Sequence, residues 1–274
     1  MTKILITGYS GFLATNLRKL LSDTQIVGLA RGACSASTDR VYDNLNDLFD
    51  HEPYFDIVFH LASLIPYPTR EYSGPEVWLS NFDLTKLLVD RYLNAKFVFS
   101  SSISVYGGCN HEEISIKSAC IPNSEYGKSK LFAENYIRAN LNNYAIVRFS
   151  SIVGPKMKPL TFIPLIIRAA RESNEITLWG DGSRLQNYID VRDAAELLIA
   201  LANNSQSLTT LGISRKYYSN LEVARIVSNY TRAIIKFEGE DNSKSVAFQY
   251  PSNLDGLGYS QKYTLDDTIK DMLK

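Results

Sequence analysis

Short apolar runs rich in β-branched residues alternate with longer amphipathic stretches through the first 150 residues of the chain. The apolar runs predict strands, and the stretches in which apolar residues recur every three or four positions predict helices. Strands are expected at residues 3–7, 25–29, 56–61, 96–101 and 144–149, and helices at 11–21, 76–93 and 125–141. Because strands alternate with crossover helices, the pattern predicts an α/β fold with a doubly wound parallel sheet.

The alternation breaks into shorter pieces beyond residue 150. The pattern there predicts an apolar helix near 161–172, a short strand at 176–179 and helices at 191–202, 220–230 and 264–273. No repeat, low-complexity tract or flexible linker is visible in the sequence. A length of 274 residues therefore fits one large α/β domain with a smaller appendage.

A glycine turn joins the first predicted strand to the first predicted helix. Gly8 permits the tight turn, Gly11 lets the backbone approach a pyrophosphate, and the small Ala14 lets the helix pack on the strand. The N-terminus of that helix would face the anion. The segment predicts a dinucleotide-binding βαβ unit, with an ordinary glycine-rich turn as the alternative.

A tyrosine and a lysine lie four residues apart in the predicted helix at 125–141. Tyr126 and Lys130 therefore share one helix face, within side-chain reach of each other. A free tyrosine titrates near pH ~10, but a neighbouring cation favours the phenolate. A hydroxyl from the run Ser100-Ser-Ser102 would hold a substrate oxygen against it. Such a set suits proton transfer to or from a carbinol or carbonyl oxygen.

Six segments follow one another in an order typical of a known family. Gly8, Gly11 and Ala14 match T-G-x-x-G-x-x-G/A, residues 59–63 match H-L-A-A, and Ser80-Asn81 with residues 81–88 match N-x-x-G/x-T-x-x-L-L. Residues 97–107 match F-x-S-S-x-x-V-Y-G, residues 146–155 match L-R-x-x-N-V-Y-G-P, and residues 179–193 match G-D-G…V-x-D. Together they resemble the extended short-chain dehydrogenase/reductase family of nucleotide-sugar epimerases, dehydratases and reductases.

The resemblance implies a Rossmann-type doubly wound parallel sheet with a small interleaved C-terminal lobe that closes over the substrate. The dinucleotide-binding domain would comprise residues 1–155 with parts of 176–215, and the substrate lobe residues 156–274. The resemblance further implies that Tyr126 exchanges a proton with the sugar oxygen and that Lys130 lowers its pKa and contacts the nicotinamide ribose. Ser102 would orient the substrate oxygen, because it matches the family position counted back from Val105-Tyr106-Gly107.

The family pattern also implies which residues bind the cofactor and the substrate. The expected cofactor-binding residues are Gly8, Tyr9, Ser10, Gly11, Phe12, Leu13, Arg31, Asn44, Leu45, Leu61, Ala62, Ser63, Asn81, Ser100, Tyr126, Lys130, Ser150 and Val153. The expected substrate-binding residues are Ser102, Ser151 and Arg184. No metal site is expected.

The identity of the cofactor depends on the end of the second strand. An NAD-specific site usually places an acidic residue there for the ribose 2′-hydroxyl, whereas this chain has Arg31. A guanidinium suits a 2′-phosphate, so NADP(H) is favoured and NAD(H) is the alternative. A solvated surface arginine is a third reading. Asp43 lies where the family contacts adenine.

The reaction type is narrowed by the two residues that follow the predicted catalytic serine, Ser102. Family dehydratases carry an Asp-Glu pair after the catalytic hydroxyl, whereas this chain has Ile103-Ser104. We therefore expect hydride transfer at one carbon, with reduction of a 4-keto sugar favoured. The alternative is a nucleotide-sugar 4-epimerase with tightly held NAD. A third reading, an inactive NAD(P)-binding regulator, is disfavoured because Ser102, Tyr126 and Lys130 are all present.

The substrate positions depart from the family pattern. Ser151 replaces the usual asparagine that contacts the nucleotide diphosphate, and Gln186-Asn187 replaces an Arg-Asp pair. Arg184, two residues upstream, would either reach a phosphate or lie on the surface. The substrate is expected to be a sugar, linked to a nucleotide but not necessarily a standard UDP-hexose.

Composition limits the remaining classes of protein. Lys+Arg and Asp+Glu both number 29, so no basic field favours a nucleic-acid partner. No apolar run reaches the ~18 residues of a membrane span, and the N-terminus lacks a signal-peptide pattern. The odd set Cys34, Cys109 and Cys120 lacks metal-ligand spacing and predicts reduced thiols. We expect a cytoplasmic homodimer.

Overall fold

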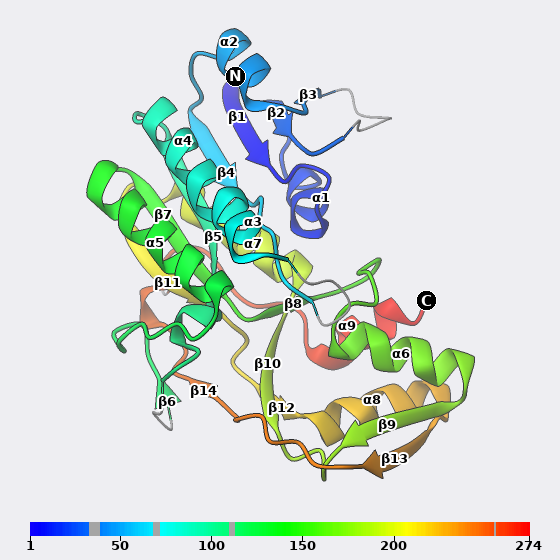
Figure 1. Cartoon of the computed structure of the whole chain (residues 1–274). Helices are drawn as coiled ribbons and strands as arrows, with labels where there is room; N and C mark the ends of the chain where they lie inside the picture. The colour runs from blue at the N-terminus through cyan, green and yellow to red at the C-terminus, as the bar shows by residue number, and fades with distance from the viewer. Residues whose placement is uncertain (33–38, 68–71, 110–112, 255) are drawn as a thin grey trace.

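The main sheet has the parallel order expected of a doubly wound α/β protein. The computed structural model describes residues 1–32, 39–67, 72–109, 113–254 and 256–274. Within these residues the main sheet has seven strands in the order β11-β7-β5-β4-β1-β2-β3, and every neighbouring pair is parallel (Figure 1). The strands are β1 (Thr2–Thr7), β2 (Thr24–Leu29), β3 (Arg40–Tyr42), β4 (Ile57–His60), β5 (Lys96–Ser102), β7 (Tyr144–Phe149) and β11 (Leu208–Gly212). The predicted fold class is confirmed.

Strand order reverses beside β1, which has β2 on one side and β4 on the other. Successive strands then extend outward from β1 in two directions, to β3 at one edge and to β11 at the other. In an open α/β sheet, ligands bind at such a reversal, outside the carboxyl ends of the strands. The glycine turn after β1 and the segment after β4 both lie at this point of the sheet.

Helices cover both faces of the main sheet. On one face α1 (Phe12–Arg18) and α7 (Val191–Asn203) pack with β1, β4, β5 and β7 in one buried cluster. On the other face α2 (Leu45–His51), α4 (Leu84–Arg91) and α5 (Glu125–Asn140) pack in a second cluster (Figure 1). Both clusters consist of side chains that recur at helical or alternate-strand spacing, which is the pattern that predicted these elements.

Several elements differ from the sequence-based expectation. The helix expected at 76–93 is divided into α3 (Gly74–Trp78), a π-helical turn η1 (Leu79–Asp83) and α4. The strands β3 and β11 and the helix α2 were not predicted. Each has only three to seven residues and shows no clear helical or strand periodicity of apolar residues. β11 nevertheless forms an edge of the main sheet by pairing with β7.

The C-terminal half forms a smaller group of elements around its own buried cluster. A three-stranded sheet contains β8 (Ser151–Val153), β10 (Leu185–Asp190) and β12 (Tyr217–Ser219), and a two-stranded sheet pairs β9 (Glu175–Trp179) with β13 (Ile234–Glu238). The helices α6 (Phe162–Glu172), α8 (Asn220–Thr231) and α9 (Leu265–Met272) pack on them (Figure 1). The division of the chain at residue 155 stays a prediction.

Short elements complete the described chain. A 3₁₀ turn, η2 (Ile103–Tyr106), follows β5, and another, η3 (Ser252–Leu254), precedes the C-terminal segment. β6 (Glu113–Ile114) pairs with β14 (Ala247–Phe248). No helix among the described residues is long and apolar enough to cross a membrane. Cys109 and Cys120 are free thiols, and Cys34 lies outside the described residues.

Candidate active site

The glycine turn brings the end of β1 against the segment that follows β4. Gly8 has a φ of +66°, and a Cβ at this position would lie 2.9 Å from the backbone of Ala62. The turn is closed by a hydrogen bond from the Gly11 N–H to the Gly8 carbonyl, at 2.7 Å. Only glycine combines this left-handed backbone with so close an approach. Ser10, Phe12 and Leu13 complete the turn and the start of α1.

The side chain of Tyr9, a predicted cofactor-binding residue, lies in the core. Its side chain is 1% exposed and lies in the core against Gly28 of β2, where any Cβ would meet the ring. Its hydroxyl donates to Asp39 and accepts from Arg18, whose guanidinium stacks 4.0 Å from the ring centroid. The side chain of Tyr9 therefore anchors α1 to the sheet, and only its backbone remains for the predicted contact.

A buried histidine links the two strands at the reversal point. His60 Nδ1 lies 2.6 Å from Thr7 Oγ1, and His60 Nε2 lies 2.8 Å from Thr85 Oγ1. Thr85 already donates its only hydroxyl proton to the Asn81 carbonyl, so it must accept a hydrogen bond from His60 Nε2. Thr7 accepts from the Ala62 N–H and is free to donate its hydroxyl proton to His60 Nδ1. The ring therefore carries its proton on Nε2. Burial, with the charge of Lys130, lowers the pKa of His60 to about 3, so the ring is neutral.

Asn81 lies in the π-helical turn η1 and connects three parts of the site. Its Oδ1 accepts from the Leu64 N–H at 2.7 Å and from the Ser63 hydroxyl at 3.2 Å. Its Nδ2 donates to the Leu64 carbonyl and to Ser129 of α5. The fully buried amide thus holds the segment after β4 against α5, and a π-helical turn at such a position is common in functional sites.

Close packing of α5 on η2 brings Tyr126 to Ser102. The N-cap Ser124 accepts from the Gly127 N–H at 3.1 Å, which starts α5 directly before Tyr126. A Cβ on Gly127 would lie 2.5 Å from the Ser104 carbonyl, so a larger residue would push the helix away. Ser102 in turn caps η2, with its Oγ accepting from the Ser104 N–H at 3.1 Å.

The titration of Tyr126 depends on burial and on two serines. Burial raises the pKa of Tyr126, and side-chain hydrogen bonds from Ser102 and Ser63 oppose that rise. Lys130 is 1% exposed, donates to the Ser100 carbonyl at 2.9 Å and lies 5.9 Å from the centroid of the Tyr126 ring. Burial lowers the pKa of Lys130 to about 7. The pKa of Tyr126 thus stays above its usual value in this structure, and the two serines, rather than the lysine, oppose the rise.

The middle serine of the run points to the opposite side of β5. Ser101 donates to Glu134 Oε1 at 2.6 Å, and Glu134 also receives two hydrogen bonds from Arg148 and one from Arg138. Burial alone would raise the pKa of Glu134, but these partners hold it below its usual range. Sequence reasoning missed this buried ion-pair network, although Arg148 lies in a quoted motif. Its position supports the choice of Ser102 over Ser101.

The predicted adenosine-side residues lie at the ends of β2 and β3. Arg31 is exposed just beyond β2. The Asn44 side chain caps α2 by accepting from the Asp47 N–H at 2.9 Å, so it has a structural partner already. Leu45, the first residue of α2, and Leu61, after β4, pack against the two core clusters. Of these four residues, Arg31 and Asn44 are exposed and the two leucines are partly buried.

Of the three predicted site residues that follow β7, two are buried and one is exposed. The Ser150 hydroxyl donates to Asn187 Oδ1 at 2.8 Å, and Asn187 donates to the Ser214 carbonyl. Val153 lies in the core of the small lobe. Ser151 is exposed on β8 and pairs with Tyr188 of β10.

Arg184 and Tyr188 lie just before and within β10, on one face of the strand. The Arg184 Nε atom and the Tyr188 hydroxyl are buried without a hydrogen-bond partner among the residues that the structure describes. Burial strongly raises the pKa of Tyr188, while the charge of Arg184 opposes that rise. Sequence reasoning named Arg184 but missed Tyr188.

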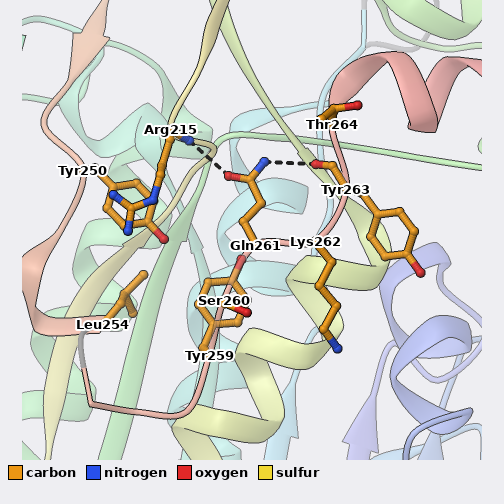
Figure 2. A pocket seen from close by; sticks show the side chains of 9 residues that line it. All are labelled: Arg215, Tyr250, Leu254, Tyr259, Ser260, Gln261, Lys262, Tyr263 and Thr264. Carbon is orange, nitrogen blue, oxygen red and sulfur yellow. Dashed lines mark hydrogen bonds between the residues drawn. The ribbon is translucent and has the colours of Figure 1, made fainter.

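A cavity of about 260 Å³ lies beside the C-terminal segment, away from the predicted catalytic residues (Figure 2). Arg215 stacks 3.9 Å from the Tyr250 ring centroid, and Gln261 accepts from the Arg215 N–H and donates to the Tyr263 carbonyl. These contacts join the last segment of the chain to the end of β11. None of the predicted site residues lines this cavity.

The fold and the site define a Rossmann-type protein with a Ser, Tyr and Lys set beside the strand reversal. The sequence model of the NAD dependent epimerase/dehydratase family matches residues 4–213. The chain therefore belongs to this family, which consists of enzymes that modify nucleotide sugars.

Characterised relatives cover almost the whole chain at low identity. The low-salt glycan biosynthesis protein Agl12 of Haloferax volcanii is 24% identical over 97% of this chain and 90% of its own length. The dTDP-glucose 4,6-dehydratase 1 of Escherichia coli K12 is also 24% identical, over 96% of this chain and 85% of its own.

Solved structures show the same fold. MoeE5 in complex with UDP-glucose and NAD superposes with a TM-score of 0.86 at 24% identity, covering 99% of this chain and 97% of its own. The UDP-glucuronic acid 4-epimerase of Bacillus cereus in complex with NAD superposes with a TM-score of 0.83 at 20% identity, with the same coverage. The chain thus shares its fold with MoeE5 and with this 4-epimerase.

Proposed function

We propose that the chain is an NAD(P)(H)-dependent oxidoreductase that acts on a 4-keto sugar linked to a nucleotide, with Tyr126 as the acid and base. The observation that carries this proposal is the meeting of Tyr126 with Ser102 beside the strand reversal, over the glycine turn. The Tyr126 hydroxyl lies where a proton could be given to, or taken from, a substrate oxygen that Ser102 holds.

The residues at the reversal fit a dinucleotide. The Gly8 turn presents backbone without a side chain. The N-cap of α1 is Gly11, so no side chain caps the first amides of the helix, which suits a pyrophosphate. Lys130, which donates to the Ser100 carbonyl, would contact the nicotinamide ribose. The bound cofactor would supply the hydride acceptor or donor, which none of these side chains provides.

In the reduction, Ser102 would hold the ketone oxygen by a hydrogen bond while Tyr126 transfers its proton to that oxygen. In the reverse oxidation, Tyr126 would take the proton from the carbinol. Ser102 and Ser63, which hydrogen-bond the Tyr126 hydroxyl, favour the phenolate that remains after proton transfer. Lys130 would add positive charge when protonated, and its pKa of about 7 makes that contribution pH-dependent.

The cofactor preference rests on Arg31. Its exposed position beyond β2 is compatible with a 2′-phosphate, so NADP(H) is our prediction. The solved relatives MoeE5 and the Bacillus cereus epimerase are complexes with NAD, and NAD(H) therefore remains the alternative. The homodimer and the cytoplasmic location also stay predictions.

A 4-epimerase is the second candidate function. It uses the same Ser, Tyr and Lys set but must keep its cofactor through a keto intermediate. Dehydration is disfavoured because the two residues after Ser102 are Ile103 and Ser104, which supply no carboxyl group.

The cofactor content of freshly purified protein separates the two candidates. Protein that arrives without cofactor and oxidises added NADPH in the presence of a 4-keto sugar nucleotide supports the reductase. A near-stoichiometric NAD⁺ that does not exchange, with product isomers and no net cofactor turnover, would replace the reductase with the epimerase. A panel of 4-keto sugar nucleotides carrying different nucleotides would identify the substrate.

A further inference from the structure

We infer that the cavity beside the C-terminal segment is a second ligand site, which binds a small carboxylate (Figure 2). Its walls come from three parts of the chain: Arg215 between β11 and β12, Tyr250 and Leu254 around η3, and residues 259–264 before α9. The volume of about 260 Å³ lies just below the ~300 Å³ at which sites for drug-sized ligands begin, so it suits a molecule of about one ring or less. None of the predicted site residues lines the cavity, so the inference does not depend on the proposed function.

The exposed Arg215 side chain is held in place without using its charge. Its guanidinium stacks on the Tyr250 ring, with Cζ 3.9 Å from the ring centroid, and its backbone N–H donates to Gln261 Oε1 at 3.2 Å. The guanidinium makes no ion pair or hydrogen bond within the part of the chain that the structure describes. Stacking occupies one face of the group and leaves its in-plane N–H donors available for a two-pronged bond to a carboxylate.

A second donor in the cavity wall is the hydroxyl of Tyr259. Its oxygen is buried and has no hydrogen-bond partner among the described residues. Burial raises the pKa of Tyr259, so the hydroxyl keeps its proton and can donate it. A buried hydroxyl without a partner is unfavourable, and a ligand oxygen that accepts from it would remove this cost.

The charges around the cavity favour a single negative charge on the ligand. The other cation in the wall, Lys262, bonds Glu196 at 2.7 Å, so Arg215 is the one charged lining side chain without an ion pair in the described parts of the chain. Asp193 accepts from the Lys262 and Tyr263 N–H groups at 3.0 and 3.1 Å, which places a second carboxylate against the same segment. One unpaired guanidinium balances one negative charge, whereas these carboxylates oppose the second charge of a phosphate. A carboxylate therefore fits the cavity better than a phosphate.

Lactate is the probe, because it combines a carboxylate with one hydroxyl on a short chain. Protein labelled with nitrogen-15 in arginine and with carbon-13 at tyrosine Cζ would be titrated by NMR, and Arg215→Gln and Tyr259→Phe would assign the two signals. In the wild type, the Arg215 Nε–H and Tyr259 Cζ signals should shift together and saturate, with a Kd on the order of 1 mM. Inorganic phosphate should bind about three-fold more weakly or worse.

Each substitution in the cavity is measured through the signal of the other residue. Arg215→Gln should weaken lactate binding about ten-fold or more, because it removes a charge-assisted bond. Tyr259→Phe keeps the ring and should weaken binding about three-fold, since it removes a neutral donor. Lys216→Gln is the matched control, because it removes the neighbouring exposed charge outside the cavity wall, and it should keep the Kd within about two-fold.

An unchanged Kd in either cavity variant would overturn the inference, because lactate would then bind elsewhere. A loss in Lys216→Gln as large as that in Arg215→Gln would overturn it as well, since binding would then follow net charge alone. The absence of a saturable shift up to about 10 mM lactate, or tighter binding of phosphate, would also contradict it. The titration needs neither cofactor nor turnover, so a failure of the proposed function would leave its result unaffected.

Discussion

The two sides of the proposed site differ in how far their polar side chains already have partners. Beside Tyr126, Ser63 and Ser102 are held in hydrogen bonds to Asn81 and Ser104. In the small lobe, Arg184 Nε and the Tyr188 hydroxyl are buried without a hydrogen-bond partner among the described residues. Each such group costs ~1–3 kcal/mol unless it is satisfied. The comparison indicates a catalytic side organised in advance and a lobe with bonding capacity left for a ligand.

The largest effect is expected on the catalytic side, from Tyr126→Phe. This change keeps the ring and removes the proton, so kcat should fall by ~10²–10⁴-fold while KM stays nearly unchanged. Tyr136→Phe, on the same helix but bonded to Asp90 at the surface, is the control and should keep full activity. Retention of more than about a tenth of wild-type turnover would remove Tyr126 from its role.

The free energy of unfolding should depend on the buried ion pair between Arg148 and Glu134. Arg148→Met leaves Glu134 charged and largely buried, so the free energy of unfolding should fall by ~3–5 kcal/mol in urea denaturation. Arg138→Met removes the more exposed partner of the same carboxylate and should cost under ~1 kcal/mol. If both variants lost the same free energy of unfolding, burial of the ion pair would not determine how much it stabilises the protein.

The next largest effect is expected on the preference between NADPH and NADH. Arg31→Ala should weaken NADPH binding by ~1.5–3 kcal/mol and NADH binding little, because only NADPH carries the 2′-phosphate. Calorimetric titration of both dinucleotides would measure this, with Lys19→Ala, at the exposed residue directly after α1, as control. Equal weakening of both dinucleotides, or of neither, would exclude a 2′-phosphate contact.

A smaller effect is expected from the lobe, and its kinetic signature should be the reverse of that of Tyr126. Arg184→Ala should raise KM for the sugar nucleotide about ten-fold with kcat almost unchanged, because it removes binding made equally in ground and transition states. Arg168→Ala, on the exposed side of α6, is the matched control. If Arg184→Ala leaves KM unchanged, the comparison between the two sides no longer holds.

The smallest effect is a pH slope of stability from Lys130. Its pKa is about 7 in the folded chain and near 10.5 when unperturbed. Between these values the unfolded chain binds one proton more than the folded chain, so the free energy of unfolding should rise with pH. The rise should be at most about 1.4 kcal/mol per pH unit and absent in Lys130→Met. Urea denaturation at pH 7, 8 and 9 would measure it; identical slopes would refute the assignment.

The sheet was predictable because its buried strands are long apolar runs separated by helical periods. The edge strands β3 and β11 were not, since their burial depends on partners distant in sequence, such as Val27 for Arg40 and Ala145 for Leu208. Among site residues, spacing was enough to pair Tyr126 with Lys130. It could not show that Tyr9 turns into the core, because that depends on the space left by Gly28.

The contacts of Ser63 and Tyr188 were beyond sequence reasoning for a related reason. Ser63 is hydrogen-bonded to Asn81 in the π-helical turn η1, whereas the sequence pattern predicted an unbroken helix there. Tyr188 was hidden because its buried hydroxyl is notable only for lacking a partner among the described residues.

The π-helical turn η1 sets the rotational phase between α3 and α4. A π turn contains an extra residue relative to an α-helix, so deleting one residue such as Leu79 would restore a regular helix while rotating one end by about 100° against the other. Asn81 and Thr85 both follow Leu79, so the deletion would rotate them together relative to α3. They could then no longer face Leu64 and His60 while Val77 of α3 keeps its buried position. One inserted residue therefore works as an angular spacer, and its loss would disconnect the strand reversal from α5 while leaving the helix itself intact.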